Sequence, residues 1–246
     1  MSLTLAELAI HIPASIELFE KYDFNYYQQG QQTFQEACKE KGLTFSAIDL
    51  ELSQLQSKVR DNHAFTLEDM GIESLIDFIN GQFHSNETEV LDQINSHIQE
   101  ALNDKMCDRS VLKLLVEIEQ KFSELMAKLI QHCHKEDQIL FPYMRKLNEF
   151  SREKGSPSSP KTISIIKNPI RMLEAEHEQA AIILSEIKKA ANNYAIPPNA
   201  PEVFKTLMDH LREFEKELHM HLHIENNILF PKLIALEEEL TNKIKQ

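Results

Sequence analysis

Residues 132–142 read HCHKEDQILFP and residues 221–231 read HLHIENNILFP, so one pattern occurs twice. Both copies fit H-x-H-x-E-x-x-I-L-F-P, and their starts are 221 − 132 = 89 residues apart. An internal repeat of this kind predicts two related pairs of helices. In each copy the first histidine and the glutamate are four residues apart, which places both on one face of a helix. An imidazole and a carboxylate on one face can reach the same inward point, so each copy predicts a metal-ligand unit.

A single unit of this kind is weak evidence, because His and Glu at this spacing also occur as a surface pair. The two copies differ from that case because each continues into Ile-Leu-Phe, which is too apolar for a solvated face. Both glutamates are therefore expected to be buried. A buried carboxylate without a partner is costly, and a bound cation removes that cost.

Two further histidines precede the two copies at similar distances. His84 follows Phe83 in an apolar stripe, 132 − 84 = 48 residues before the first copy. His177 lies in MLEAEHEQAAIIL, 221 − 177 = 44 residues before the second. A lone histidine on a helix is usually structural or exposed, but the matched spacing favours a ligand role. The candidate metal ligands are His84, His132, Glu136, His177, His221 and Glu225.

The composition of this ligand set limits the choice of metal. Zinc is usually satisfied by four ligands, and calcium and magnesium avoid imidazole. Four histidines and two glutamates suit a pair of iron or manganese ions. We expect two non-haem iron ions with two histidines on each, an oxo or hydroxo bridge, and Glu136 and Glu225 as bridging ligands. Coordination positions then remain for a small diatomic ligand.

Apolar residues recur at helical spacing in four long stretches. These cover about 72–102, 109–149, 168–193 and 202–243. Asn168 is the expected N-cap of the third helix, with Pro169 at its first position. The segment GSPSSP at 155–160 separates the second and third stretches, and Pro142 and Pro231 are expected to bend or end regular helix. The pattern predicts an all-α protein with an antiparallel up-down-up-down four-helix bundle over 72–246.

Residues 1–60 are predicted to form a small helical domain of their own. Thr4 and Glu7 have the spacing of a capping box at its first helix. The segment DNHAFTLEDMG at 61–71 is predicted to be a linker to the bundle. Because so short a unit has little apolar surface to bury, we expect it to dock on the bundle or on a partner chain.

Composition argues against several other classes of protein. The net charge is −13 and no basic stripe occurs, so nucleic acid is not an expected partner. Cys38, Cys107 and Cys133 are far apart without a CxxC motif, which favours a reducing compartment over a disulfide framework. No apolar run of about 18 residues and no signal peptide are seen. The sequence therefore predicts a cytoplasmic protein without membrane association.

The motifs HKEDQILFP, EHE and HIENNILFP resemble those of the RIC family, the YtfE/ScdA-type repair of iron centres proteins. That resemblance extends to the N-terminal unit and implies a hemerythrin-like di-iron bundle with the same six ligands. It implies a role in restoring iron–sulfur clusters damaged by nitric oxide or oxidative stress, through iron delivery or redox chemistry. Damaged or apo iron–sulfur proteins would be the acceptors, and nitric oxide and oxygen the small ligands, of a monomer or homodimer.

Other functions are compatible with the same ligands. A hemerythrin-like protein can bind or sense oxygen or nitric oxide without any repair activity. The iron can also serve only as a staple in a structural or regulatory protein. Whether the protein is an enzyme is left open by the sequence.

The chain departs from the family pattern at the N-terminal unit. In YDFNYYQQGQQT, the positions of the family's adjacent cysteine pair hold Tyr27 and Gln28, which removes any thiol role there and puts full repair activity in doubt. Glu87, where relatives can have histidine, and Glu176, before His177, are candidates for a place beside the metal ligands or in solvent.

Three further histidines lie close to the motif histidines but are not expected to bind the iron. His134 and His223 lie two residues after ligand histidines, about 200° around the helix, on an exposed or helix-contacting face. His219 and His223 are four residues apart and could form a weak surface metal-binding patch.

Overall fold

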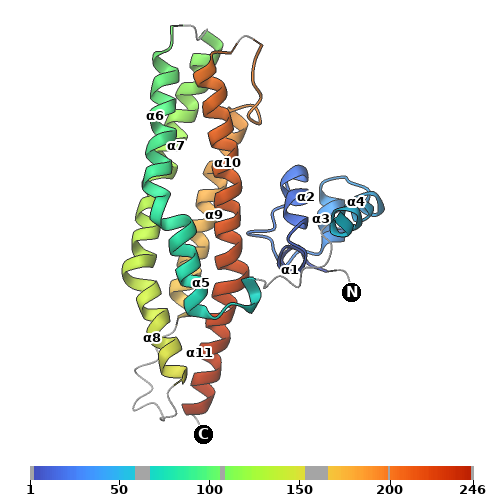
Figure 1. Ribbon diagram of the computed structural model, residues 1–246, viewed down its shortest axis with the longest axis vertical. Helices are drawn as coiled ribbons and strands as arrows, with labels where there is room; N and C mark the ends of the chain where they lie inside the picture. Colours follow the sequence, from blue (N-terminus) through green and yellow to red (C-terminus); the bar gives the residue numbers. More distant parts are fainter. Residues whose placement is uncertain (1–2, 59–66, 106–108, 153–165, 199, 245–246) are drawn as a thin grey trace.

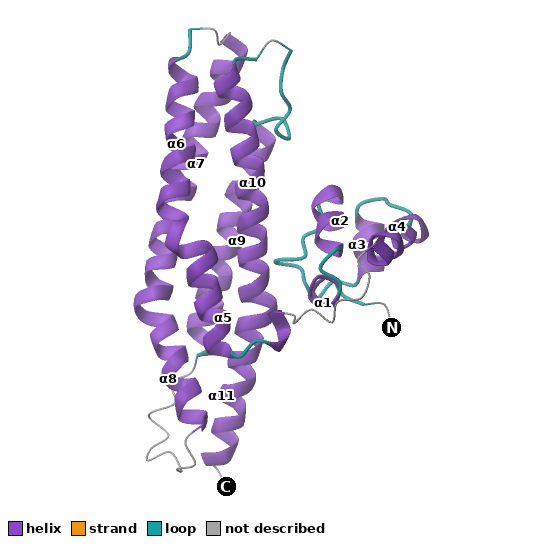
Figure 2. Ribbon diagram, in the orientation of Figure 1, coloured by secondary structure: helices purple, strands orange, loops and turns teal. Residues whose placement is uncertain are grey.

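The computed structural model describes residues 3–58, 67–105, 109–152, 166–198 and 200–244. Within these residues the chain is helical, apart from turns and one antiparallel bridge between Thr4 and Thr33 (Figure 2). Four long helical rods run side by side, and a small helical unit at the N-terminus lies against their flank (Figure 1). The predicted all-α fold class is confirmed.

Each rod of the bundle consists of one to three consecutive elements. In chain order these are α5 (Ile72–Ile79), the π-helical turn η2 (Asn80–His84) and α6 (Ser85–Asn103); α7 (Arg109–Lys135), the π-helical turn η3 (Glu136–Leu140) and α8 (Phe141–Arg152); α9 (Lys167–Ala190); and α10 (Glu202–Ile224), the π-helical turn η5 (Glu225–Leu229) and α11 (Phe230–Ile244).

The rods are arranged as the sequence predicts for an up-down-up-down bundle. Each rod runs opposite to the one before it, as Figure 1 shows. Helix α7 packs against α6 and α9, and α10 packs against the same two helices. The four rods therefore form a closed ring around a shared interior.

Two of the π-helical turns end just before the prolines of the repeated motif. A proline lacks an N–H group, and its ring clashes with the carbonyl four residues earlier. Immediately before Pro142, the Phe141 N–H bonds to the Glu136 carbonyl five residues back, and Phe230 bonds to Glu225 in the same way. Each proline thus follows a single wide turn that begins at a candidate ligand, a place where π-helical turns often occur.

The apolar interior of the bundle is divided into two clusters. The first is formed by α6, α7, α9 and α10, with fully buried members such as Ile98, Phe122 and Leu211. The second is formed by α5, α8, α11 and the start of α9, with members such as Ile76 and Phe230. All three π-helical turns lie along the chain between elements of the two clusters, so polar side chains enter the interior between two apolar ends.

The start of the third rod differs from the expectation. Asn168 is not its N-cap, because α9 begins at Lys167 with Ile166 in the capping position. The Ile166 N–H donates to a carboxylate oxygen of Glu237 on α11, so a residue distant in sequence satisfies this helix end. The separating segment GSPSSP at 155–160 lies outside the described residues.

The N-terminal unit contains α1 (Leu5–His11), α2 (Ser15–Tyr22), α3 (Phe34–Glu40) and α4 (Phe45–Lys58). The predicted capping box is present at Thr4 and Glu7, with both hydrogen bonds made. An apolar cluster rich in aromatic rings, including Phe19 and Phe34, fills the space between the four helices. Of the predicted linker, residues 61–66 lie outside the described part and Leu67–Asp69 form a short 3-10 helix, η1.

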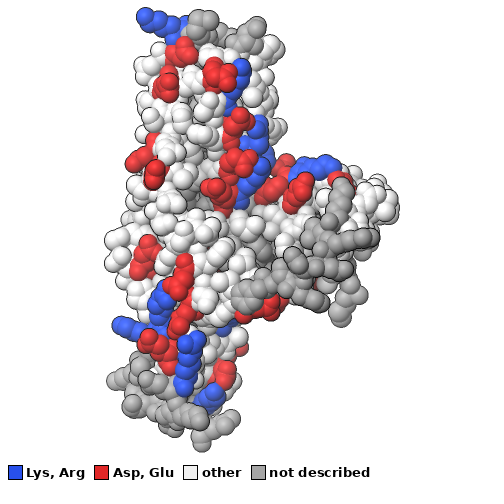
Figure 3. All heavy atoms as spheres, viewed as in Figure 1, with Lys and Arg blue, Asp and Glu red and all other residues white. Residues whose placement is uncertain are grey.

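The surface of the protein carries both signs of charge. On the face drawn in Figure 3, acidic and basic side chains alternate along the bundle, and no basic stripe is visible among the described residues. The net charge of the full chain is −13. No described helix is long and apolar enough to cross a membrane.

Candidate metal centre

All six candidate ligands meet in the interior of the bundle. They form two groups that share both glutamates, and within each group one ligand atom per residue lies within 4.8 Å of the others. Position A consists of His84, Glu136, His221 and Glu225, and position B consists of His132, Glu136, His177 and Glu225. Each position takes one histidine from either half of the bundle, as a pseudo-twofold arrangement requires.

The histidine rings point their Nε2 atoms at one another. The Nε2 atoms of His84 and His221 are 3.2 Å apart at position A, and those of His132 and His177 are 3.0 Å apart at position B. Two ligands at right angles on one metal, each about 2.1 Å away, are separated by about 3.0 Å. The donor spacing in both groups therefore fits a first-row transition metal.

In three of these rings, the Nδ1 atom lies within hydrogen-bond distance of an acceptor oxygen from another side chain. The acceptors are Asp137 for His84 at 2.8 Å, Glu176 for His132 at 3.0 Å and Asn226 for His177 at 2.8 Å. From these partners we assign the Nδ1–H tautomer, which leaves Nε2 as a bare lone pair. At position B, two such lone pairs face each other at 3.0 Å. A cation between them, which is a proton in the metal-free protein and a metal ion in the loaded one, removes this repulsion.

The carboxylates of Glu136 and Glu225 are fully buried, and none of their four oxygens accepts a hydrogen bond. Their oxygens do come within 3.2–3.4 Å of the histidine Nε2 atoms, but without hydrogen-bond geometry. Buried carboxylates are stable only when paired or bound to a cation. The residues therefore fit a two-metal centre, with one glutamate on either side of both positions.

In the absence of metal, protons hold this cluster together. Burial alone would lower the pKa of His132, but the charges of Glu136, Glu225 and Glu176 outweigh it and raise the pKa to about 10. Burial would raise the pKa of Glu225, yet His221 and His177 bring it well below its usual value. A metal ion entering position B must displace the proton of His132.

The repeated motif also supplies the residues that orient the lone histidines. Asp137 and Asn226 each follow the motif glutamate, and each bonds to the lone histidine of its own half, His84 or His177. The motif phenylalanines act alike: Phe141 stacks on His84 at 5.5 Å and Phe230 on His177 at 5.9 Å between ring centroids. These four roles are not among the sequence-based predictions, although the matched places of the four residues in the repeat were a usable signal.

Glu176 and Glu87, the two candidates for a place beside the ligands, differ in their contacts. Glu176 bonds to His132 and also pairs with Lys135, and these contacts outweigh the effect of burial and lower its pKa. Glu87 is in neither metal group but lines a small cavity beside His221 and lies near the Cys133 thiol. Burial, together with Glu87, raises the pKa of that thiol.

The expected surface patch at His219 and His223 is wrong. Both side chains are buried, with 7% and 2% exposure, because this face of α10 is covered by the N-terminal unit. His219 pairs with Glu20 at 3.0 Å and stacks on Tyr27, and His223 bonds to Asn227. His134, by contrast, is exposed on α7.

Two cavities reach the centre from outside the bundle. One of about 140 Å³ lies between α7 and α9, where His132 and His177 form its inner wall and Glu176 and Lys135 its rim. The other, of about 50 Å³, lies beside His221 between α6 and α10. The larger of these two cavities therefore lies beside position B.

Comparison with known proteins agrees with a metal-binding site in this bundle. Residues 82–233 match the family described as the hemerythrin HHE cation-binding domain, a range that contains all six candidate ligands. The iron–sulfur cluster repair protein YtfE of Citrobacter koseri is 32% identical, covering 95% of this chain and 97% of its own. A probable iron–sulfur cluster repair protein of Haemophilus influenzae is 29% identical, over 94% and 96% of the two chains.

Proposed function

Because this chain belongs to the family of hemerythrin-like iron–sulfur cluster repair proteins, we propose that it holds two iron ions and uses them to restore damaged iron–sulfur clusters. Its acceptors are damaged or apo iron–sulfur proteins, and the stress that calls for it is nitric oxide or oxidative damage. The relatives are named iron–sulfur cluster repair proteins, and this chain matches them over nearly their whole length. Both facts support a shared role.

The observation that carries this proposal is the pair of donor groups that share Glu136 and Glu225. Four carboxylate oxygens are buried without hydrogen bonds, and histidine Nε2 atoms face each other at 3.0 and 3.2 Å. Six donors in two overlapping groups exceed the needs of a single structural zinc ion. We propose iron because mixed imidazole and carboxylate ligation suits it.

The residues of the proposed centre have two kinds of role: some would bind the metal, and others orient the histidine ligands. Glu136 and Glu225 would supply carboxylate oxygens and two negative charges to both positions, and two histidines would complete each position. Asp137, Glu176 and Asn226 fix the ring orientations and tautomers. Two bound irons supply redox chemistry toward small diatomic molecules and are also a store of iron for delivery.

The departure at Tyr27 and Gln28 bears on the mechanism. No thiol is present there, so any repair by this protein relies on the metal centre and not on cysteine chemistry in the N-terminal unit. The described free cysteines, Cys38 and Cys133, are both buried.

The metal centre is tested by metal analysis of protein purified without oxygen. We expect about two irons per chain, and loss of both in the variant Glu136→Ala with Glu225→Ala. A matched control is Glu174→Ala with Glu178→Ala, since both of these glutamates are exposed on α9. Zinc alone, or no metal even after reconstitution with iron, would refute the proposal.

The use of the iron is tested by mixing ⁵⁷Fe-loaded protein with an apo iron–sulfur protein. Repair by delivery predicts that the label appears in the acceptor's cluster and that the double glutamate variant transfers none. Reversible oxygen or nitric oxide spectra without any iron transfer would instead indicate a binding or sensing protein.

A further inference from the structure

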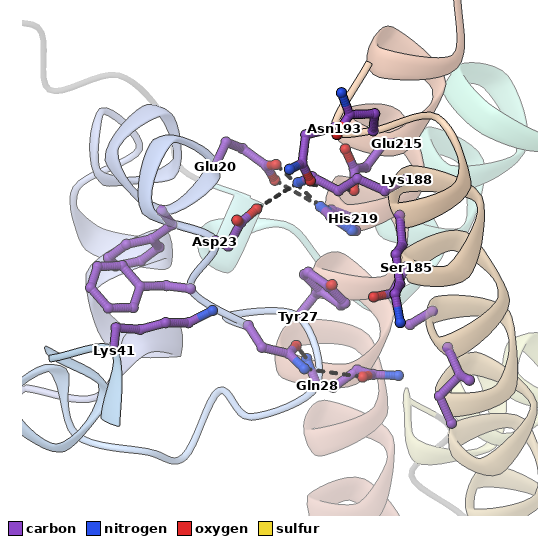
Figure 4. A pocket seen from close by; sticks show the side chains of 17 residues that line it. Glu20, Asp23, Tyr27, Gln28, Lys41, Ser185, Lys188, Asn193, Glu215 and His219 are labelled. Atoms are coloured by element: carbon purple, nitrogen blue, oxygen red, sulfur yellow. Dashed lines mark hydrogen bonds and ion pairs between the residues drawn. The ribbon is translucent and has the colours of Figure 1, made fainter. Parts of the chain in front are cut away.

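The loop formed by residues 25–30, between α2 and α3, is one of the places where the N-terminal unit contacts the bundle. This loop extends toward α9 and α10, as Figures 1 and 4 show. Side chains of α10 and η5 receive it: Tyr27 stacks on His219 with 3.9 Å between ring centroids, and Asn227 donates to the Tyr26 carbonyl. Beside it lies a cavity of about 550 Å³, bridged by Asp23 and Lys188.

Two routes connect this loop to one candidate ligand, His177: one direct hydrogen bond and one path through Asn226. Gln28 donates from Nε2 to the His177 backbone carbonyl at 3.1 Å. Asn226 donates from Nδ2 to the Tyr27 carbonyl at 2.9 Å, while its Oδ1 lies 2.8 Å from His177 Nδ1. The Asn226 amide therefore cannot rotate without losing both partners, and the loop fixes the face that it presents to His177.

The loop is itself held in shape around Gln28. Asn25 donates from Nδ2 to Gln28 Oε1 at 3.1 Å, and its Oδ1 accepts the Gln28 backbone N–H at 3.0 Å. The Gln28 amide thus has its oxygen committed to the loop and its nitrogen to α9. This arrangement depends on an amide at position 28, because a carboxylate cannot donate to the His177 carbonyl.

These contacts reach position B only. His177 belongs to position B, whereas His84 of position A is held by Asp137 within the bundle and His221 stacks on Phe83. In the described part of the chain, no hydrogen bond joins the N-terminal unit to His84 or His221. The larger of the two cavities described above also lies beside position B.

We propose that loop 25–30 is a clamp on metal position B, with Gln28 and Asn226 as positioning residues for His177. While the loop is docked, His177 keeps its Nε2 directed at the metal. When the loop detaches, Asn226 is free to turn, His177 loses its orientation, and the iron at position B leaves first. This inference rests on the proposed di-iron function and assigns iron release to one of the two positions.

The test is the rate at which a ferrous chelator removes iron from the reduced, loaded protein. In Gln28→Glu, which keeps the shape but loses the donor, we expect one iron per chain to leave about ten-fold faster than in wild type. The second iron should leave at the wild-type rate. Gln29→Glu is the matched control, because Gln29 is the next residue in the chain, its side chain is exposed, and the charge change is the same.

A second variant, Asn25→Ala, removes the hydrogen bonds that hold Gln28 within the loop and changes no residue of the bundle. It should increase the rate at which the iron at position B is released. Unchanged release in Gln28→Glu, or equal acceleration of both irons, would overturn the inference. Failure of the wild type to hold two irons would refute the proposed function as well, so the two failures are distinguishable. Thermal unfolding of the variants verifies that they fold.

Discussion

Asp137 Oδ1 lies 2.8 Å from His84 Nδ1, and one repeat later Asn226 Oδ1 lies 2.8 Å from His177 Nδ1. The two contacts are related by the pseudo-twofold arrangement of the bundle, but one acceptor is a carboxylate and the other an amide. A carboxylate makes its histidine a stronger electron donor than an amide does. The two metal positions therefore differ in their surroundings although their ligand types are the same.

Asp137→Asn should weaken metal binding at position A. The amide can still accept from His84, so the change removes mainly the charge, and we expect the affinity for one iron to fall by about ten-fold. Chelator competition on the loaded protein measures this. Asp92→Asn, at an exposed position on α6, is the control. Equal affinities in all three proteins would show that the Asp137 charge has no influence on the metal.

Replacing the two glutamates that both ligand groups share should separate stability from metal binding. Without metal, the buried carboxylates of Glu136 and Glu225 are balanced by protonated His132, and desolvating such a charge cluster costs more free energy than burying apolar side chains of similar volume. We expect metal-free Glu136→Met with Glu225→Met to be more stable than metal-free wild type by about 1–3 kcal/mol at pH 8. Denaturant unfolding measures this.

Added iron gives the complementary result. A ligand that binds only the folded state stabilises it by mass action, so iron should raise the unfolding midpoint of wild type. The double methionine variant should not respond. A variant less stable than wild type when both lack metal would contradict this account of the glutamates.

The six candidate ligands could be found from sequence because two independent patterns agreed: the H-x-x-x-E repeat and the matched distances to His84 and His177. Spacing identifies residues on one helix face, which is a local property. It does not show that His84 is paired with His221, and His132 with His177. That pairing depends on the order of the rods around the bundle, which contacts between distant residues determine.

The errors at His223 and Asn168 have the same origin. Helical periodicity placed His223 away from the ligands but could not show that the N-terminal unit covers that face. Asn168 had good capping chemistry, yet the helix starts earlier, and Glu237 from α11 accepts the N–H of Ile166, two residues before Asn168. In both cases a contact between distant segments decided the outcome.

Acid should weaken the fold through His223. Burial lowers the pKa of His223 from 6.5 to about 4, so the unfolded chain takes up a proton at a higher pH than the folded one. Stability from this residue is present above pH 6.5 and is lost as the pH falls toward 4. The loss amounts to about 2–3 kcal/mol at pH 4.5.

His223→Asn isolates this effect, since the new side chain can still accept the hydrogen bond from Asn227 but does not titrate. The free energy of unfolding of the metal-free variant should fall less than that of wild type between pH 7 and 4.5. Other histidines titrate in both proteins, so the difference between the two curves is the relevant quantity. Parallel curves would show that His223 is not the group responsible.

A methyl group at Gly30 should disrupt the docking of the N-terminal unit. A Cβ there would lie 2.3 Å from Asn227 Oδ1 and 2.9 Å from the Ala6 Cβ, so α1 and η5 both approach this position too closely for a side chain. Overpacking of this kind costs about 1–3 kcal/mol. Gly30→Ala should therefore expose the 25–30 loop to limited proteolysis while the bundle remains folded. Gly81→Ala is the control, because a Cβ there meets nothing within 4 Å. Equal resistance of both variants and wild type would show that the unit does not rely on this close contact.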